Sequence, residues 1–389
     1  MNSTIENIKR LLTECNMTQL DLANKSGIAH ETINKIVNGK YSPSAKLLSK
    51  IASALKVDID YLTSTTKTDI HTDVQGYIEY CGEIIKVTSY KHLQKLMERI
   101  EYETKTLPQE VKEIRAINEQ NRKAIKRAGA SYTFDLNFDT IQSHDTTQVD
   151  CWAFKTSKDT KGGITLDLGN QCSGYPFTMN GHTFHTSESA YLCGQFSDNT
   201  AQCQEIQQRL HRETNGYTAK KYIKNAHKEL IRDDWDSFRA EWMMYVIWSK
   251  CKDNRAFAEK LMQIPREAVI IENSTTVHEG TNMYWGCINQ EIEQARDKVA
   301  KYVELKYQND IRFGKIKKRD VNLDESIQAA RDEIQYIGTY GGGRNYMGKI
   351  LKRCQLALLD GVEPQIDYDL LRSKQIYLFG ELLTFSDVL

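Results

Sequence analysis

The sequence predicts a mainly α-helical protein whose C-terminal part is a helix-rich α+β module. A chain of 389 residues exceeds one ordinary hydrophobic core, so two or three domains are expected. Apolar residues recur at helical spacing through residues 3–63. Strand patterns are confined to short stretches such as GYIEYCGEIIKV and the apolar run Ala268–Ile271. We therefore expect domains at residues 1–65, 66–130 and 131–389.

Composition bounds the class of protein. Lys plus Arg and Asp plus Glu both number 52, so nucleic-acid binding would require a local basic patch. The nine cysteines form no C-x-x-C pair and no Cys/His cluster with zinc spacing, and no signal peptide is found. We therefore expect the cysteines to be reduced thiols. The longest apolar run, Trp242–Trp248, is too short to span a bilayer. We expect a cytoplasmic protein with no metal, no cofactor and no membrane partner.

Residues 3–63 predict five short helices. Thr18 has the N-cap preference for the second helix, and Gly27 ends that helix. The third helix is closed by Asn38-Gly39, and Ser42-Pro43-Ser44 gives a start signal for the fourth.

This stretch resembles the helix-turn-helix domain of the Cro/phage-repressor type, whose third helix enters the DNA major groove. The resemblance implies an operator DNA partner and a homodimer. Carried over position by position, it implies base-edge contacts from His30, Glu31, Thr32 and Lys35, and phosphate contacts from Gln19, Lys40 and Tyr41. A helical bundle used only for protein contacts is the alternative.

Residues 66–130 contain no recognisable chemistry. Ser64–Asp73 is polar and predicts a linker, and the alternating segment after it predicts a hairpin that turns near Cys81-Gly82. One helical stripe runs from Leu93 to Ile100, and a charged helix is expected from Pro108 to Arg127. We interpret this region as a spacer or dimerisation element, with a disordered tether as the alternative.

Four later stretches contain polar side chains that a core does not need: Leu168–Tyr191, Ile231–Lys250, Ala268–Gly286 and Gly341–Cys354. In the first, Ser187-Glu188 opens a helix that continues with small and apolar residues. An acidic side chain is favoured there by the helix dipole, which is a sufficient structural reason on its own. In the second, Trp235, Arg239 and Met243 are predicted to share one helical face.

The fourth stretch fits the G-x-x-x-x-G-K frame of a phosphate-binding loop. However, Ile350 stands where a Ser or Thr hydroxyl must bind magnesium, which disfavours an NTPase. Three glycines before a helix still expose backbone N–H groups suited to a phosphate, and Arg344 and Arg353 could add bidentate contacts. A Gly-rich turn without a ligand is the alternative.

Together the four stretches resemble the NADAR, or YbiA-like, family of N-glycosidases that act on ADP-ribose or riboflavin-precursor substrates. The resemblance spans about residues 131–356 and rests on the ordered pieces LGN, YPFTMNGHTFHTSESAY, AKK, W-x-x-F-R, VIIE, WG and G-x-N-x-x-G. The chain departs from the family pattern at Gln195, where a Lys is common, and at Asn282, which aligns with an Asp. Lys221, or Lys220, is then expected to supply the missing cation.

The resemblance implies that a carboxylate stabilises an oxocarbenium-like state during C–N cleavage. Its catalytic residues would be Glu188, Glu272 and Lys221. We expect the helix N-terminus to lower the pKa of Glu188, unless burial raises it more, which makes Glu188 an ionised stabiliser or a base for water. Trp235 and Trp285 would stack on a base, although either could be ordinary core. The other substrate-binding candidates are Asn170 and Asn345 for the ribose hydroxyls, together with Ser187, Arg239, Gly286, Gly343, Arg344, Gly348 and Arg353.

The leading hypothesis is a DNA-binding N-glycosidase that removes ADP-ribose from a nucleobase, such as guanine in DNA. It would act as an antitoxin or phage-defence component that represses its own operon, partnered with an ADP-ribosyltransferase toxin. One alternative is a transcriptional regulator that senses an ADP-ribose-like ligand without turnover. Another is a glycosidase for a ribosylamino-pyrimidine phosphate.

Overall fold

The N-terminal module is a bundle of five helices. The computed structural model describes residues 2–15, 17–63, 74–128, 132–273 and 282–385. The bundle consists of α1 (Asn2–Glu14), α2 (Gln19–Ser26), α3 (His30–Val37), α4 (Ala45–Leu55) and α5 (Ile59–Thr63). Their apolar faces meet in one core that includes Ile8, Leu22, Ile33, Ile51 and Leu62. The five predicted helices are confirmed, whereas the predicted linker at Ser64–Asp73 lies outside the described residues.

A hairpin and two helices follow the bundle. Strands β1 (Gly76–Tyr80) and β2 (Glu83–Val87) form a two-stranded sheet, and Cys81 and Gly82 adopt positive φ angles in the tight turn that was predicted there. Helix α6 (Tyr90–Glu101) continues through a π-helical segment, η1 (Tyr102–Thr106), into α7 (Leu107–Ala128). The chain divides into two compact units, Met1–Gly76 with Lys86–Leu93 and Tyr77–Ile85 with Gln94–Leu389.

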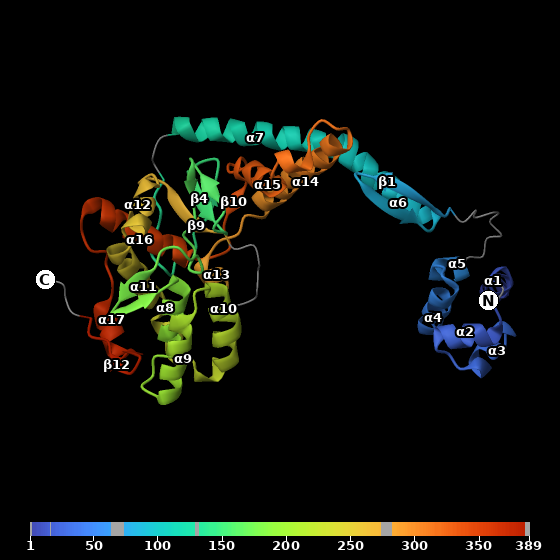
Figure 1. Cartoon of the computed structure of the whole chain (residues 1–389), viewed down its shortest axis with the longest axis horizontal. Helices are drawn as coiled ribbons and strands as arrows, with labels where there is room; N and C mark the ends of the chain where they lie inside the picture. Colours follow the sequence, from blue (N-terminus) through green and yellow to red (C-terminus); the bar gives the residue numbers. More distant parts are fainter. Residues whose placement is uncertain (1, 16, 64–73, 129–131, 274–281, 386–389) are drawn as a thin grey trace. The chain divides into compact units, whose positions relative to one another are not determined.

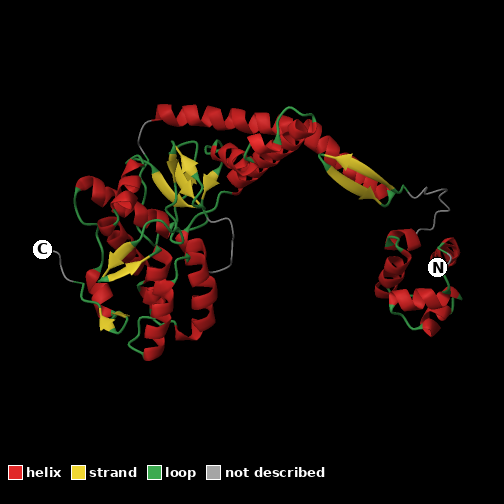
Figure 2. Ribbon diagram, in the orientation of Figure 1, coloured by secondary structure: helices red, strands yellow, loops and turns green. Residues whose placement is uncertain are grey.

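The C-terminal body contains several two-stranded sheets (Figure 2). The parallel pair is β4 (Cys151–Phe154) and β9 (Val269–Glu272), in which Phe154 lies opposite Glu272. The antiparallel pairs are β3 (His144–Asp145) with β10 (Thr339–Tyr340), β5 (Thr160–Lys161) with β6 (Ile164–Thr165), β7 (Phe177–Met179) with β8 (His182–Phe184), and β11 (Tyr377–Leu378) with β12 (Glu381–Leu382).

Helices surround these strands (Figure 1). Those before β9 are α8 (Ser187–Gln195), α9 (Ala201–Arg212), α10 (Gly216–Thr218), the π-helical η2 (Ala219–Ile223), the 3-10 segments η3 (Lys224–Leu230) and η4 (Trp235–Ser237), α11 (Arg239–Asp253) and α12 (Arg255–Gln263). Those after it are α13 (Asn282–Trp285), α14 (Gln290–Arg312), the 3-10 segment η5 (Lys318–Asp320), α15 (Leu323–Asp332), α16 (Tyr346–Asp360) and α17 (Tyr368–Ser373). In Figure 1, α7 runs along α14. The predicted fold class, mainly α with a helix-rich α+β part, is confirmed.

The packing of α8 on α11 depends on a missing side chain. A Cβ atom at Gly194 would lie 2.3 Å from the indole nitrogen of Trp242, so only glycine allows this approach. The same indole N–H donates a hydrogen bond of 3.1 Å to the carbonyl of Tyr191. Trp242 is fully buried, and it therefore fixes α8 in the middle of the core.

Helix α11 begins later than predicted. Trp235 lies in η4 and Arg239 is the first residue of α11, so Trp235, Arg239 and Met243 do not share one helical face. The hydroxyl of Ser237 donates to the carbonyl of Asp234 at 2.7 Å, a local bond that competes with a regular helix.

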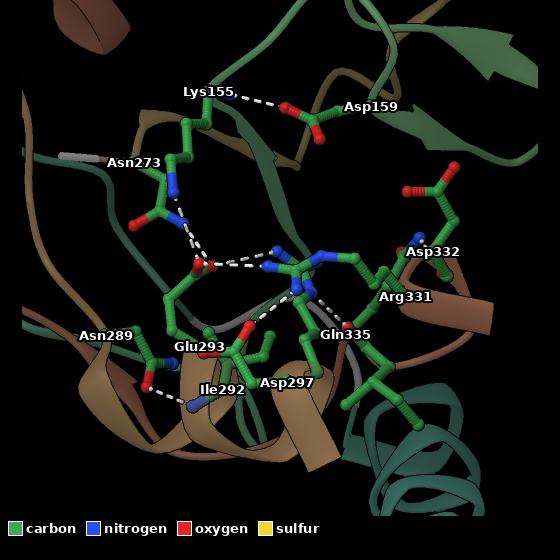
Figure 3. Close-up of polar contacts among 12 residues, drawn as sticks. Lys155, Asp159, Asn273, Asn289, Ile292, Glu293, Asp297, Arg331, Asp332 and Gln335 are labelled. Carbon is green, nitrogen blue, oxygen red and sulfur yellow. Dashed lines mark hydrogen bonds and ion pairs between the residues drawn. The ribbon is translucent and has the colours of Figure 1, made fainter. Parts of the chain in front are cut away.

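A polar network attaches α14 and α15 to the end of β9 (Figure 3). The carboxylate of Glu293 accepts from the side-chain amide of Asn273 at 2.9 Å and pairs with Arg331 at 3.3 Å. Lys155, one residue after β4, also reaches Glu293 at 3.4 Å, and Arg331 pairs with Asp297 at 2.6 Å. Because Asn273 directly follows Glu272, this network holds the chain where the candidate site begins. No helix in the described part of the chain is both long and apolar enough to cross a membrane.

Candidate DNA-binding helix and candidate active site

The second and third helices form a turn that local capping determines. The hydroxyl of Thr18 accepts from the backbone N–H of Asp21, and the Asp21 carboxylate accepts from the backbone N–H of Thr18. Gly27 ends α2 in the left-handed conformation at φ 61°. These caps fix the direction in which α3 leaves the turn.

Helix α3 buries one face and exposes the other. Ile33, Ile36 and Val37 lie in the core, and the exposed face presents His30, Glu31 and Lys35, with Thr32 half-buried. Lys35 forms an ion pair of 2.7 Å with Glu31 one turn earlier. Lys40 and Tyr41 are exposed just beyond the helix, and Gln19 is the first residue of α2. The side chains proposed to contact DNA therefore lie on the surface of this turn or at its edges.

The first carboxylate of the second site is Glu188. Thr186 caps α8 by accepting from the backbone N–H of Ser189, so Ser187-Glu188 opens the helix as predicted. The backbone N–H of Glu188 donates to the carbonyl of Asn170 at 2.9 Å. A Cβ atom at Gly216 would lie 3.1 Å from that of Glu188, so α10 packs directly against the carboxylate's stem. Glu188 is only 6% exposed.

The second carboxylate, Glu272, belongs to a strand whose backbone is bound by the side-chain amide of Asn345. Asn345 donates its amide N–H to the carbonyl of Ile270 at 2.8 Å and accepts from the backbone N–H of Glu272 at 3.1 Å. Gly348 makes room for this arrangement, because a Cβ atom there would lie 2.1 Å from the Ile270 carbonyl. Asn345, expected to bind a ribose hydroxyl, is 1% exposed and fully engaged with β9. Its role is to position Glu272.

The two carboxylates lie within electrostatic reach of each other. The charge of Glu188 raises the pKa of Glu272, and the charge of Lys220 acts on both carboxylates in the opposite direction. Lys224, one turn after Lys220, also acts on Glu188. The expected cation Lys221 instead places its Nζ 5.2 Å from the ring centres of both Tyr217 and Tyr222. Lys220 is the lysine that faces the site, because adjacent positions on a helix point in different directions.

Burial dominates the protonation of both carboxylates. It raises the pKa of Glu272 to about 7. It also raises the pKa of Glu188, against the opposing charges of Lys220 and Lys224. Burial therefore outweighs the helix N-terminus at Glu188, which was expected to lower this pKa. The pair combines one carboxyl that is partly protonated at neutral pH with one that faces two lysines, an arrangement suited to acid and base roles.

Aromatic rings join the carboxylates to a cationic rim. Tyr191, one turn after Glu188, makes edge contacts with Trp235 at 5.0 Å and with Trp285 at 5.3 Å between ring centres. Trp285 in turn contacts Tyr346 at 5.8 Å. Two guanidinium groups lie over the ring of Tyr284, Arg239 at 4.3 Å and Arg344 at 5.0 Å.

Buried polar atoms near this site have no hydrogen-bond partner among the described residues. They include Oε2 of Glu272 and Oδ1 of Asn170. An unpaired buried acceptor costs about 1–3 kcal/mol, so each is a point where a substrate hydroxyl or amide would be favoured. No group of three or more His, Cys, Asp or Glu side chains in the described ranges is arranged to bind a metal ion.

Several expected site residues have other partners. Ser187 is fully buried, and its hydroxyl accepts from the ammonium of Lys250 at 3.3 Å. Arg353 donates to the carbonyl of Leu136 at 2.9 Å, and its guanidinium lies over Phe138 at 4.2 Å. It also lines a groove with Glu241. Arg353 lies about two turns into α16, whereas Arg344 precedes that helix, so the two arginines serve different surfaces.

The glycine-rich stretch packs against its neighbours. The N–H of Gly341 is bonded to the carbonyl of Ile288 at 3.0 Å. Gly343 is buried, and its carbonyl accepts from Cys287. Lys349, the lysine of the phosphate-loop frame, donates to the carbonyls of Asn137 at 2.5 Å and Thr140 at 2.7 Å. This lysine is structural, in agreement with the argument against an NTPase.

The remaining predicted positions lie at the border of the site. Gly286 is buried next to Cys287, whose N–H donates to the carbonyl of Glu272 at 2.9 Å. Gln195 ends α8, is 7% exposed and has an unpartnered Oε1 among the described residues. Most of the predicted polar loop after Glu272, and the side chain of Asn282, lie outside the described residues. The sequence argument did not identify Lys224, Tyr191 or Tyr284, although Tyr191 stands one helical turn after Glu188.

Comparison with known proteins separates the two modules. The helix-turn-helix family model matches residues 8–62. An uncharacterized HTH-type transcriptional regulator of Methanocaldococcus jannaschii is 51% identical over 45 residues, 12% of this chain and 68% of that protein. Another, of Archaeoglobus fulgidus, is 43% identical over 53 residues, 14% of this chain and 75% of that protein. The solved NMR structure of the E. coli protein YbiA is similar at a TM-score of 0.29 and 18% identity, covering 47% of this chain and 97% of that chain. Through its N-terminal module, this chain belongs to the helix-turn-helix family of HTH-type transcriptional regulators.

Proposed function

We propose that this DNA-binding regulator is also an N-glycosidase that removes an ADP-ribosyl group from a nucleobase, such as guanine in DNA. The observation that carries the proposal is that two buried carboxylates, Glu188 and Glu272, interact electrostatically with each other and with the exposed Lys220, while Oε2 of Glu272 lacks a partner in the described ranges. Buried carboxylates with perturbed pKa values beside a cation are typical of acid–base sites. The family resemblance of the four stretches agrees with this chemistry.

The reaction would proceed by cleavage of the C1′–N bond. The bonding electron pair leaves with the nitrogen, which takes a proton from the neutral carboxyl of Glu272. The ribosyl cation that develops is stabilised by the carboxylate of Glu188. Water then attacks C1′ and gives its proton to Glu188, so the products are a free amino group on the base and a hydroxyl at C1′.

The rim would bind the rest of the substrate. Arg239 and Arg344 lie over the same tyrosine ring, so their guanidinium groups can approach one phosphate-bearing group. The partly buried ring of Trp285 is proposed to contact the leaving base. An ADP-ribosyltransferase toxin as partner, a homodimer and repression of the protein's own operon are further parts of this proposal.

The test uses an oligonucleotide carrying ADP-ribosylated guanine. The wild-type protein should release ADP-ribose and restore the unmodified base, as followed by mass spectrometry. Glu188→Gln and Glu272→Gln should each lower the rate by about 10²- to 10⁴-fold. Glu241→Gln is the matched control, because Glu241 is also a carboxyl whose pKa is raised by burial but lies in the groove with Arg353. Equal release by wild type and both site variants, or release by none, would reject the proposal.

A second candidate is a regulator that binds an ADP-ribose-like ligand without turnover. It is favoured by Gln195, a neutral side chain where the resembled family commonly has a lysine. Ligand-dependent operator binding without product formation would support it. A ribosylamino-pyrimidine phosphate offered as substrate in the same assay tests the remaining alternative.

A further inference from the structure

A basic surface with exposed tyrosines adjoins the carboxylate pair. It is formed by α10, η2 and η3, and we define this basic aromatic surface by Tyr217, Lys220, Lys221, Tyr222, Lys224 and Lys228. It begins at the candidate site, because Gly216 of α10 packs against Glu188 and Lys220 acts on both carboxylates. The surface belongs to the C-terminal body and is separate in sequence from the helix-turn-helix module.

Three of its lysines lie close enough for their like charges to act on one another. Burial lowers the pKa of Lys224, and the charges of Lys220 and Lys228, four residues before and after it, lower that pKa further; the chain kinks at His227, between Lys224 and Lys228. Within the described part of the chain, none of the three is in an ion pair. Like charges that lie close together repel one another. An anionic ligand would offset that repulsion, and a phosphate backbone presents charges in a row.

The two tyrosines have the geometry of a stacking platform. Tyr217 is 53% exposed and Tyr222 is 59% exposed, although large aromatic side chains are normally covered. The ammonium of Lys221 lies 5.2 Å from both ring centres, so it links the two rings and keeps a positive charge between them. Alternating cations and exposed rings match the alternating phosphates and bases of an unpaired strand.

We propose that the basic aromatic surface binds a single-stranded segment of nucleic acid and guides its modified base to Glu188 and Glu272. This inference rests on the proposed glycosidase function, since it describes how a polymeric substrate reaches that site. An unpaired strand fits better than a duplex, because bases in a duplex are stacked inside it and must be extruded before chemistry can occur on them. A lipid surface fits less well, because insertion requires an apolar helix face, and η2 and η3 expose mainly polar side chains.

Strand binding is tested on the full-length protein with a fluorescent oligothymidylate, read by anisotropy. This probe cannot form the duplex that the helix-turn-helix module would read. Tyr217→Ala combined with Tyr222→Ala should weaken binding on the order of tenfold or more. Lys221→Gln combined with Lys228→Gln should reduce the slope of log affinity against log salt by about 1.4, roughly 0.7 for each lysine.

Matched controls lie on exposed surfaces elsewhere. Tyr77→Ala and Lys158→Gln remove the same side-chain types and should leave the affinity for oligothymidylate unchanged. Lys40→Gln tests the helix-turn-helix module as an alternative binding site and should also have no effect. Loss of affinity only in Lys40→Gln, or equal loss in all variants, would overturn the proposal. Binding to anionic vesicles without binding to oligothymidylate would do the same.

Turnover separates this inference from the glycosidase proposal. The Tyr217→Ala, Tyr222→Ala double variant should process an ADP-ribosylated oligonucleotide at least tenfold less efficiently through a higher KM, and an ADP-ribosylated mononucleoside at the wild-type rate. Wild-type turnover of both substrates by this variant would reject the strand surface while keeping the glycosidase. Oligothymidylate binding that depends on the tyrosines, without turnover of either substrate by the wild type, would reject the glycosidase while keeping a strand-binding surface.

Discussion

The helix-turn-helix module and the C-terminal body differ in whether they bury charged side chains. Every buried residue in the core of the first module is apolar, and no charged side chain is buried among its described residues. The body buries charged side chains that include Glu103, Lys161, Glu188, Lys250, Lys349 and Lys352. Burying a charge costs several kcal/mol unless partners compensate. The first module therefore keeps its charged side chains at the surface, whereas the body buries several of its own.

Within the body, partners divide the buried charges into two kinds. Lys349 and Lys352 each donate to two backbone carbonyls, which satisfies them as structural ties. The carboxylates of Glu188 and Glu272 instead interact electrostatically, and Glu272 Oε2 has no partner in the described ranges. The difference teaches that burial alone does not mark a chemical group, since Glu103 also has a buried Oε2 without a partner among the described residues; Glu272 differs by interacting with a second buried carboxylate.

The largest effect should come from the ionisation of Glu272. The proposed role of proton donor requires Glu272 to be protonated, and its pKa is raised to about 7 by burial. We expect kcat/KM for glycosidic cleavage to fall about tenfold for each pH unit above that value. Glu272→Gln should remove this dependence together with most of the activity. A rate that rises between pH 7 and pH 9 would reverse the assignment of acid and base.

The buried Lys250 should make stability depend on pH. Burial lowers its pKa to about 8, so between pH 8 and pH 10.5 the unfolded chain binds a proton that the folded chain does not. The sign of the linkage is therefore positive for this lysine, and its contribution to the free energy of unfolding should rise by about 3 kcal/mol as pH increases across this window. All five tryptophans lie in the body, so denaturation followed by tryptophan fluorescence reports on it.

Lys250→Met is the variant that isolates this effect. It should remove this contribution, so the difference in unfolding free energy between wild type and variant should change by about 3 kcal/mol between pH 8 and pH 10.5. Lys40→Met in the first module, where the lysine is exposed, should leave the dependence unchanged. Parallel pH profiles of the unfolding free energy for wild type and Lys250→Met would show that Lys250 does not contribute this pH dependence.

A smaller loss of stability is expected when the space that Gly348 leaves beside Asn345 is filled. Gly348→Ala would place a Cβ atom 2.1 Å from the Ile270 carbonyl and 2.4 Å from the Asn345 amide nitrogen. We expect a loss of about 2 kcal/mol in stability of the body and reduced turnover, because Glu272 loses its backbone support. Gly76→Ala, where no heavy atom lies within 4 Å, should change stability by less than about 0.5 kcal/mol. Similar effects of both changes would contradict the proposed clamp.

The smallest effect on stability is expected on α3. The ion pair between Glu31 and Lys35 is exposed, so Lys35→Gln should change stability by less than about 0.5 kcal/mol. Operator binding should nevertheless weaken, by about 1–3 kcal/mol if Lys35 contacts a base edge. Cleavage of an ADP-ribosylated mononucleoside should be unchanged. Loss of cleavage in this variant would show that the two modules do not divide their tasks as described.

Local signals explain what the sequence predicted well. The cap at Thr18, the left-handed Gly27 and the start of α8 at Ser187 depend on residues within one turn, and all three are confirmed. The four-residue spacing of Trp235, Arg239 and Met243 suggested one helical face, yet side-chain bonding at Ser237 delays the helix. Spacing alone therefore did not locate the start of α11.

The site depends on contacts between distant segments, which the sequence pattern does not encode. Nothing local indicates that Asn345 binds the backbone of β9, since its partners stand more than seventy positions earlier. The choice between Lys220 and Lys221 required the orientation of η2. Only Tyr191 had a signal in the sequence, because it shares a helix face with Glu188 one turn earlier.

The carboxylate of Glu293 shows how α14 and α15 support the end of β9. It receives Asn273, the residue next to Glu272, and Arg331 from the returning helix, so the two helices act as a buttress for the strand end. Removal of α14 and α15 to obtain a shorter fragment would also remove the Glu293 network that supports the end of β9. A shortened chain would then keep every catalytic side chain and still lose the alignment between them.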